Sequence, residues 1–394
     1  MKILHLVPYT IFAQNYVQGI NEIHTEEHIF WIYGSRNNAI GQEIKIPEYN
    51  NIYYGNMGAE YEQSRQMFLG LYEQIQMIVF QAIPENERFL QLVVTALRKR
   101  PVPFALVPWG RDMFCTSSLY MEPDKERIKR IDAYKKYLLE ECRVIVVSEY
   151  GYRYLKDHYH MRAKKYFFNS LREFALEEYS SDFSDKNRGE IGILLGHRGT
   201  ATGRHIEVLS FLNQFETKDF DIICPLSYGE PEYISKVSQR GEKLFGSHFT
   251  KLTEWMQRRQ YYEFLDQNID IAIFNNSSSE GGTTMYVLGF LGKKMYINRE
   301  NENYWCLKEM GLIVHAFAED EGEIEFKKPL STEEKAHNKA CISHFFSDRN
   351  FERNWTAIFE DCGSQKHRPY TYEEEKEDGH QRYFKYSTIF NAQN

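Results

Sequence analysis

A stretch from Ile193 to Leu212, ILLGHRGTATGRHIEVLSFL, combines glycines with cationic side chains where a strand meets a helix. The apolar run before Gly196 predicts a buried strand, and the residues after His205 have the spacing of an amphipathic helix. Such a turn presents free backbone N–H groups and the positive end of a helix dipole, which together suit a phosphate. Any α/β protein also changes direction through turns of this kind, so the stretch alone does not establish a site.

A second loop, NNSSSEGGTT after Phe274, has a similar composition. Gly281 and Gly282 allow close approach of a ligand to the backbone, and Thr283 and Thr284 fall in the first turn of the next predicted helix. Two anion-binding helix starts in one sheet suit a diphosphate better than a single phosphate. Simple N-capping explains either threonine equally well, and that alternative stays open.

Charged and aromatic side chains surround these loops and extend the predicted site. The arginines and the histidine can neutralise phosphate oxygens, and the glutamates can accept hydrogen bonds from ribose or sugar hydroxyls. Ordinary surface or capping roles are an equal alternative for each of them. The residues predicted to bind a nucleotide-sugar donor are Gly196, Arg198, Gly199, Thr202, Arg204, His205, Tyr228, Glu280, Gly281, Gly282, Thr283, Thr284, Arg299 and Glu300.

The segments that carry these loops alternate between strand and helix patterns. This alternation predicts two Rossmann-like halves, each a parallel sheet covered by helices, with a cleft between them. Ligands of open parallel sheets bind beyond the carboxyl ends of the strands, where the loops above begin. The polar, aperiodic residues 176–190 are the predicted linker between an N-terminal domain (1–175) and a C-terminal domain (191–345). In the first half, the run from Ser64 to Ile83 predicts one helix.

Composition narrows the class of protein. The chain has 394 residues, 42% of them hydrophobic and 26% charged, which excludes global disorder and suggests at least two domains. A net charge of −8 argues against a nucleic-acid partner. No CxxC pair occurs among six scattered cysteines, so we expect free thiols in a reducing cytoplasm and no structural metal: Cys115, Cys142, Cys224, Cys306, Cys341 and Cys362. The N-terminus reads as a first strand, and no segment has the length of a transmembrane helix.

One motif in the N-terminal half, WGRDMF, follows a predicted strand. Asp112 is the carboxylate that we select as general base, because a residue at this strand end should face the cleft. Trp109 is predicted to stack on a sugar ring, and Arg111 lies in the same loop. Alternatively, Asp112 caps a helix and Trp109 closes the core.

Five stretches together resemble glycosyltransferase family 56: WGRDMF, ILLGHRGTATGRHIEVL, CPLSYGEPEYISKV, SEGGTTMYVLGFLGKKMYINREN and HFFSDRNFERNW. The resemblance covers roughly residues 1–360. It implies a GT-B fold, with the acceptor in the N-terminal domain, the donor in the C-terminal domain and a final helix (346–362) crossing back. On this basis Trp109 and Arg111 are predicted to bind the acceptor. The resemblance also implies transfer, without a required metal, of a deoxy-amino sugar from a TDP or UDP donor to a polyprenyl-diphosphate-linked saccharide in bacterial surface polysaccharide assembly.

The chain departs from that family at Arg111, where a small residue is expected, and at His197, where an amide is expected. The polar tail (363–394) has no counterpart in the family, and these departures leave the sugar and the acceptor open. The rival hypotheses are a sugar-nucleotide epimerase or hydrolase, a non-catalytic sugar-nucleotide-binding protein, and a GT-A transferase that uses the DFD at Asp219–Asp221. We interpret DFD as a solvated turn, because it precedes its strand.

Local basic segments predict where the enzyme works. TALRKRPVPF (Thr95–Phe104) and KERIKRIDAYKKYLLEECR (Lys125–Arg143) concentrate Lys and Arg in an otherwise acidic chain. Such a surface favours an anionic bilayer. We therefore expect a cytoplasmic protein bound peripherally to the inner face of the cell membrane, with solvated helix faces as the alternative.

Overall fold

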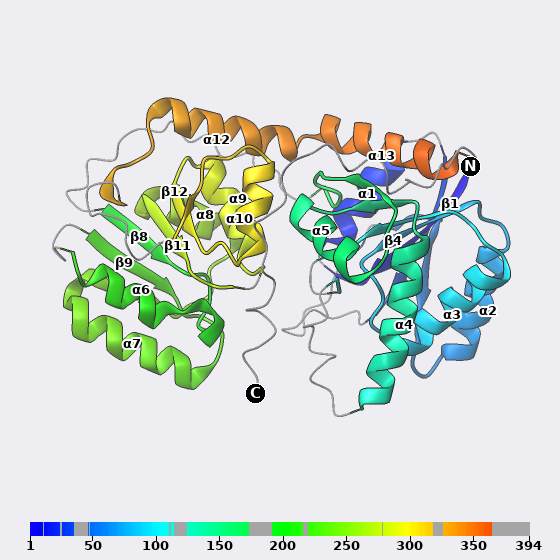
Figure 1. The fold of residues 1–394 in the computed structure, drawn as a ribbon, viewed down its shortest axis with the longest axis horizontal. Coiled ribbons are helices and arrows are strands. Elements are labelled where there is room, and N and C mark those ends of the chain that lie inside the picture. The colour runs from blue at the N-terminus through cyan, green and yellow to red at the C-terminus, as the bar shows by residue number, and fades with distance from the viewer. Residues whose placement is uncertain are drawn as a thin grey trace. The chain divides into compact units, whose positions relative to one another are not determined.

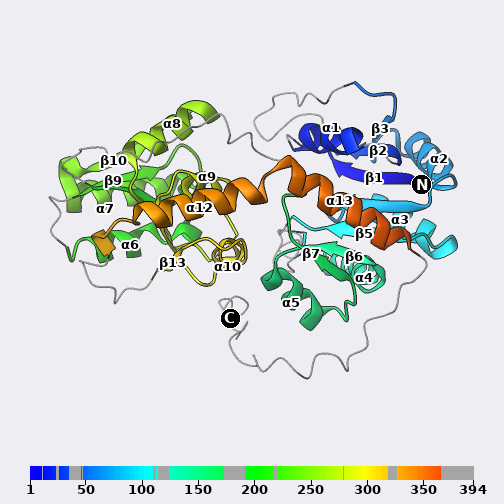
Figure 2. The same ribbon diagram turned by 90° about the horizontal axis from the view of Figure 1, so that it is seen from above.

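The computed structural model of the chain describes residues 1–10, 12–23, 26–34, 46, 48–109, 112–113, 124–172, 191–215, 220–277, 279–317 and 326–364. These residues fall into two compact units. Unit 1 comprises the described residues up to 172 together with 346–364, and unit 2 comprises 191–345. Both units are parallel α/β sheets with helical layers, shown in Figures 1 and 2. The predicted fold class, two α/β units with parallel sheets, is confirmed.

Unit 1 is built on a seven-stranded sheet with the strand order β3-β2-β1-β4-β5-β6-β7. All of its described strand pairs are parallel. Its elements are β1 (Lys2–Pro8), α1 (Ala13–Ile23), β2 (Glu27–Tyr33), β3 (Ile52–Gly55), α2 (Tyr61–Tyr72), β4 (Met77–Gln81), α3 (Glu87–Lys99), β5 (Phe104–Val107), α4 (Lys125–Glu141), β6 (Val144–Val146), α5 (Glu149–His158) and β7 (Lys164–Tyr166).

One prediction for this sheet is wrong. The run from Ser64 to Ile83 is not a single helix, because α2 ends at Tyr72 and Met77–Gln81 forms the central strand β4. Every residue of β4 is buried, since helices cover both faces of a parallel sheet. A short buried segment with four consecutive apolar residues therefore lacks the alternation that marks a half-exposed strand, and its periodicity does not separate strand from helix.

The helix α13 (Asp348–Gly363) completes the core of unit 1. Ser347 caps its first turn by accepting a hydrogen bond from the Asn350 N–H. Trp355 is fully buried, with its ring centroid 5.6 Å from that of Tyr16 on α1 and 5.7 Å from that of Phe168. The last helix thus packs on the strands and helix that begin the chain.

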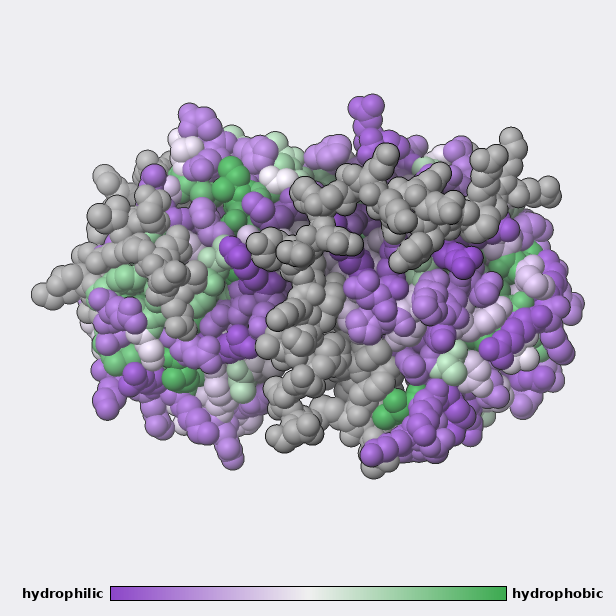
Figure 3. Space-filling model, in the orientation of Figure 1, coloured by the Kyte–Doolittle hydropathy of each residue, from purple (hydrophilic) through white to green (hydrophobic). Residues whose placement is uncertain are grey.

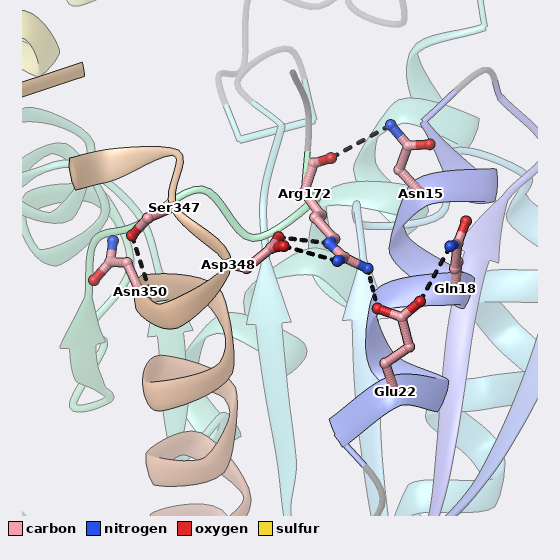
Figure 4. Close-up of polar contacts among 7 residues, drawn as sticks. All are labelled: Asn15, Gln18, Glu22, Arg172, Ser347, Asp348 and Asn350. Carbon is pink, nitrogen blue, oxygen red and sulfur yellow. Dashed lines mark hydrogen bonds and ion pairs between the residues drawn. The ribbon is translucent and has the colours of Figure 1, made fainter. Parts of the chain in front are cut away.

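Arg172 joins α13 to α1 on the surface of unit 1, as Figure 4 shows. Its guanidinium donates to both Asp348 carboxylate oxygens, at 2.7 and 3.0 Å, and also pairs with Glu22. The Asn15 side chain donates to the Arg172 carbonyl. Gly19 leaves room for the arginine stem, since a Cβ there would lie 2.9 Å from Arg172 Cδ. Arg172 has a φ of +52°, and these contacts hold it in that uncommon conformation.

Unit 2 is built on a six-stranded parallel sheet with the order β10-β9-β8-β11-β12-β13. The strand order reverses at β8, which lies between β9 and β11. Its elements are β8 (Ile191–Leu195), α6 (His205–Leu212), β9 (Phe220–Pro225), α7 (Pro231–Phe245), β10 (Phe249–Leu252), α8 (Arg258–Asn268), β11 (Ile271–Phe274), α9 (Gly282–Phe290), β12 (Lys294–Ile297), α10 (Glu302–Glu309), β13 (His315–Ala316) and α12 (Thr332–Phe345). Ligands of such sheets bind where the order reverses, so the loops after β8 and β11 are the expected binding edge.

No helix among the described residues is long and apolar enough to cross a bilayer. On the face shown in Figure 3, small apolar patches are scattered among hydrophilic side chains.

Candidate functional site

The loops at the carboxyl ends of the unit 2 strands are bonded to one another. Gly199, after β8, donates its N–H to the Tyr228 carbonyl after β9 at 3.0 Å, and its own carbonyl accepts from the Glu230 N–H at 2.8 Å. The Asn298 amide, after β12, donates to the Asn275 side-chain oxygen, after β11, at 2.9 Å. The segments predicted from the sequence to share a site therefore lie along one edge.

Arg198 and Glu280 form an ion pair between the loops after β8 and β11. The guanidinium donates to both carboxylate oxygens, with Nε 3.1 Å from Oε2, and both side chains are partly buried. The Thr202 hydroxyl lies 3.5 Å from the same Oε2. Burial, and then the neighbouring Arg198, lower the pKa of His197 to about 4, so its imidazole is neutral beside the pair. Three of the predicted donor residues thus form one cluster, with His197 against it.

A second ion pair links the loop after β8 to the loop after β12. Arg204, whose φ is +48°, donates to Glu300 at 3.2 Å, and both side chains are more than a third exposed. The Glu300 N–H donates to the Asn298 side chain at 2.8 Å, which holds this loop in place. Arg299 is exposed, and its carbonyl accepts from the Trp305 indole at 2.8 Å.

The start of α6 differs from its prediction. The Tyr233 hydroxyl accepts hydrogen bonds from the backbone N–H groups of His205, at 3.0 Å, and Ile206. A side chain of the protein therefore caps the helix end where the sequence suggests a phosphate. His205 is fully buried, and a Cβ on Gly196 or Gly203 would lie 2.5 or 2.3 Å from its ring. In this structure the buried imidazole packs against the backbone of the loop at Gly196 and Gly203 and does not reach the surface.

The start of α9 has the opposite character. Gly281 occupies the N-cap position with a φ of +82° and has no side chain to cap the helix, and no other side chain of the described residues bonds to its first N–H groups. Thr283 is exposed, and Thr284 bonds to Tyr261, whose pKa is raised by burial. The threonines follow the N-cap, which excludes the N-capping alternative for both of them. The α9 N-terminus keeps its backbone donors for a ligand.

Buried asparagines behind α9 were not predicted as site residues. The Asn276 and Asn303 amides each donate to the Glu280 carbonyl at 3.3 Å, and both side chains are buried. Asn301 is also buried and accepts from the Asn303 N–H. The sequence signal for them is position, because each lies in the loop or first helical turn that follows one of the buried strands β11 and β12. They fix the backbone that leads into α9.

In unit 1, Asp112 is buried and 5% exposed. Its carboxylate accepts hydrogen bonds from the Ile83 N–H at 2.7 Å and the Trp109 N–H at 2.8 Å, and Lys135 donates to its carbonyl at 3.0 Å. Burial raises the pKa of the carboxyl, against the opposing effect of both N–H groups and of Lys135. Asp112 thus ties the end of β5 to the end of β4. The next helix among the described residues, α4, is capped by Asp124 instead.

The aromatic neighbour of this loop is positioned by the same strand end. Trp109 is partly buried, and its indole N–H lies 3.4 Å from the Gln81 side-chain oxygen. Its ring meets Phe12 edge-on, with centroids 6.0 Å apart. Arg111, the other residue predicted to contact the acceptor, lies outside the described residues.

Most cations of the predicted membrane-binding helix are paired with carboxylates. On α4, Arg127 and Arg130 both contact Glu87, and Lys129 pairs with Glu126. Lys135 is buried. These contacts reduce the positive charge that α4 offers to an anionic surface, so the structure adds no support to electrostatic docking through this helix.

The DFD motif lies away from the binding edge. Asp221 is the second residue of β9, at the amino end of the strand, and accepts from His248 Nδ1 at 3.0 Å. The predicted turn is wrong at this residue, because β9 begins at Phe220, whereas Asp219 lies outside the described residues. No group of three potential metal-ligating side chains occurs among the residues that the structure covers.

The solved structures similar to this chain include named glycosyltransferases. HepE from Anabaena, solved in complex with UDP, has a TM-score of 0.64 at 12% identity, over 91% of this chain and 100% of its own. A glycosyltransferase from Rickettsia africae has a TM-score of 0.59 at 12% identity, over 92% and 99%. The lipopolysaccharide outer core galactosyltransferase WaaB, in its apo form, has a TM-score of 0.56 at 12% identity, over 91% and 99%. These similarities establish the GT-B fold.

A family model gives the chain its place within this fold. It matches residues 125–363, more than half of the chain, and is described as 4-alpha-L-fucosyltransferase, glycosyl transferase group 56. The match spans both arginine–glutamate pairs and the α9 start. The chain therefore belongs to glycosyltransferase family 56, has the GT-B fold and is a hexosyltransferase.

Proposed function

We propose that this enzyme transfers a deoxy-amino sugar from a TDP- or UDP-linked donor to a polyprenyl-diphosphate-linked saccharide in bacterial surface polysaccharide assembly. The observation that carries the donor class is the uncapped α9 N-terminus at Gly281, beside the point where the strand order reverses. Backbone N–H groups and a helix dipole there suit a diphosphate. The UDP bound to the structurally similar HepE supports the same class of donor.

In the absence of a ligand, the two arginine–glutamate pairs hold the arginines of the site in place by ion pairing. A diphosphate offers Arg198 and Arg204 more negative charge than the carboxylates of Glu280 and Glu300 do, so we expect each guanidinium to shift toward phosphate oxygens on binding. The released carboxylates then accept hydrogen bonds from donor hydroxyls. As the glycosidic bond breaks, charge grows on the leaving diphosphate, which the α9 dipole and both arginines stabilise.

The remaining assignments belong to this proposal as well. Metal-independent transfer follows from the cationic donor loops, which neutralise the diphosphate without a divalent ion. Trp109 and Arg111 are proposed to contact the acceptor, and Asp112 stays the predicted general base. A peripheral position on the inner face of the cell membrane would bring the enzyme to a lipid-linked acceptor, whose tail remains in the bilayer.

A ligand screen tests the donor assignment. Thermal shift would be measured with TDP, UDP and a panel of sugar nucleotides, with inorganic pyrophosphate as the reference anion. We expect stabilisation by a bare nucleoside diphosphate, and release of that diphosphate from the matching sugar nucleotide only when a lipid-linked saccharide is added. No shift with any nucleotide would refute the donor assignment, and release without an acceptor would indicate a hydrolase.

A further inference from the structure

Two large aromatic side chains on the surface of unit 2 have no structural role that explains their exposure. Trp255 is 72% exposed and Tyr228 is 51% exposed, and they are the large hydrophobic side chains of the described part of unit 2 that stand out to solvent in this way. Burying an indole ring normally stabilises a protein, and an exposed indole lacks this contribution. A ligand that covers the ring would explain its exposure.

The two aromatics occupy equivalent positions in the loops that follow two adjacent strands, β9 and β10. Pro225, the last residue of β9, pairs with Leu252, the last residue of β10. Tyr228 and Trp255 each lie three residues beyond these paired ends, and the Leu226 N–H donates to the Leu252 carbonyl at 2.8 Å as the loops begin. Neighbouring strands are about 4.8 Å apart, so the two loops start side by side at the carboxyl edge.

This edge continues into the proposed phosphate site. The loop after β9 is bonded to the loop after β8 through Gly199 and the Tyr228 carbonyl. Partial burial raises the pKa of the Tyr228 hydroxyl, and the charges of Arg198 and Glu280 also act on it, so this end of the half-exposed side chain lies near that ion pair. Along the sheet order the aromatics therefore lie on the β9 and β10 side of β8, and the α9 N-terminus lies on the β11 side.

From this arrangement we infer that Trp255 and Tyr228 form a stacking platform for the nucleobase of the donor, a role that rests on the proposed nucleotide-sugar donor. A nucleoside diphosphate carries its base and its phosphates on opposite sides of one ribose. Phosphates at the α9 N-terminus, with Tyr228 two strands away after β9 and Trp255 three strands away after β10, match this layout. Stacking accepts any base with a π face, so the platform holds thymine and uracil alike.

The test compares ligands with and without a base. Calorimetry would give the affinities of the full-length wild type and the Trp255→Ala variant for TDP, UDP and inorganic pyrophosphate. We expect Trp255→Ala to weaken both nucleotides about tenfold, as expected for the loss of one base–aromatic stack, and to leave pyrophosphate unchanged. Trp255→Phe and Tyr228→Phe should keep most of the affinity, whereas Tyr228→Ala should lose it. Binding of TDP should also quench wild-type indole fluorescence more than it quenches Trp255→Phe.

Two controls make the outcome specific. Tyr49→Ala removes an exposed aromatic of unit 1 and should leave every affinity unchanged. A melting temperature equal to that of the wild type would show that Trp255→Ala is folded. If the wild type binds TDP and Trp255→Ala binds it equally well, the stacking platform is refuted while the donor assignment stands. If the wild type binds neither nucleotide, the donor assignment and the platform both fail. Equal weakening of pyrophosphate would also refute stacking.

Discussion

Replacing Asp112 by Asn separates a loop-fixing role from the predicted role of general base. The carboxylate accepts from two backbone N–H groups, those of Ile83 and Trp109. An Asn amide keeps one oxygen acceptor but must present its NH₂ group to the other N–H. Two donors then face each other in a buried place, and one backbone N–H is left without an acceptor.

The size of the effect follows from these contacts. A hydrogen bond to a charged group contributes about 1.5–3 kcal/mol, and an unsatisfied buried donor costs about 1–3 kcal/mol. Removing a buried charge offsets part of this loss, because burial raises the pKa of Asp112. We expect Asp112→Asn to lower the free energy of unfolding by about 2–4 kcal/mol. For a unit of this size, the melting temperature would fall by roughly 5–15 °C.

Urea denaturation with a constant m-value, together with a transfer assay well below the melting temperature, measures both roles. The matched control is Asp124→Asn, because Asp124 accepts the Arg127 N–H at 2.9 Å as the N-cap of α4. Asn is as good an N-cap as Asp, so this variant should change stability by less than about 0.5 kcal/mol.

The two roles predict different outcomes for Asp112→Asn. A loop-fixing residue gives an unstable protein that keeps part of its transfer activity at low temperature. An unchanged denaturation midpoint together with complete loss of transfer would refute the stability argument and support Asp112 as the general base.

Four further predictions concern other contacts. Gly281→Asn, which tolerates the left-handed backbone, should weaken TDP binding by about tenfold or more in calorimetry, and unchanged affinity would move the diphosphate away from α9. Arg172→Ala should destabilise unit 1 by about 1–2 kcal/mol in urea, less in high salt because its partners are exposed, and a salt-independent loss would contradict the ion-pair contribution. Tyr233→Phe removes the cap of α6 and should cost about 1–2 kcal/mol in urea; no change would mean that water replaces it. His197 and His205 each have a pKa of about 4 in the folded protein and 6.5 in the unfolded chain. As the pH falls, the unfolded chain therefore binds protons before the folded protein does. The free energy of unfolding should fall between pH 6.5 and pH 4, by up to about 1.4 kcal/mol per pH unit for each group. His197→Asn should show a smaller slope, and an equal slope would remove His197 from this account.

Much of the fold could be predicted because its signals are local. The alternation of buried strands and amphipathic helices indicates parallel α/β halves, and the strand ends locate the loops that carry the site. The region from Ser64 to Ile83 shows the limit of this reasoning. The strand β4 has no polar face, because helices cover both sides of the sheet, so nothing within Met77–Gln81 itself reveals its conformation.

The site was harder to predict, because the contacts that decide it are not local. In the sequence Asp112 seems free to act as a base, yet one of its carboxylate oxygens accepts a hydrogen bond from the N–H of Ile83, 29 positions earlier. The hydroxyl of Tyr233 reaches the His205 N–H from 28 positions later. Residue type and spacing identify which side chains can do chemistry. Only the folded structure shows which of them already make hydrogen bonds within the protein.

The two helix starts of unit 2 illustrate how similar sequences take different parts in one site. Both follow a buried strand through a glycine-containing loop, and both predict a phosphate. Because Tyr233 caps α6, the loop before it is held rigidly, and that rigidity positions Arg198 and Arg204 toward the neighbouring loops. Gly281 leaves the start of α9 open, so its backbone donors remain for a ligand. In the proposed donor site, the first loop contributes the positive charge of the two arginines and the second contributes the helix dipole, and a diphosphate is large enough to contact both.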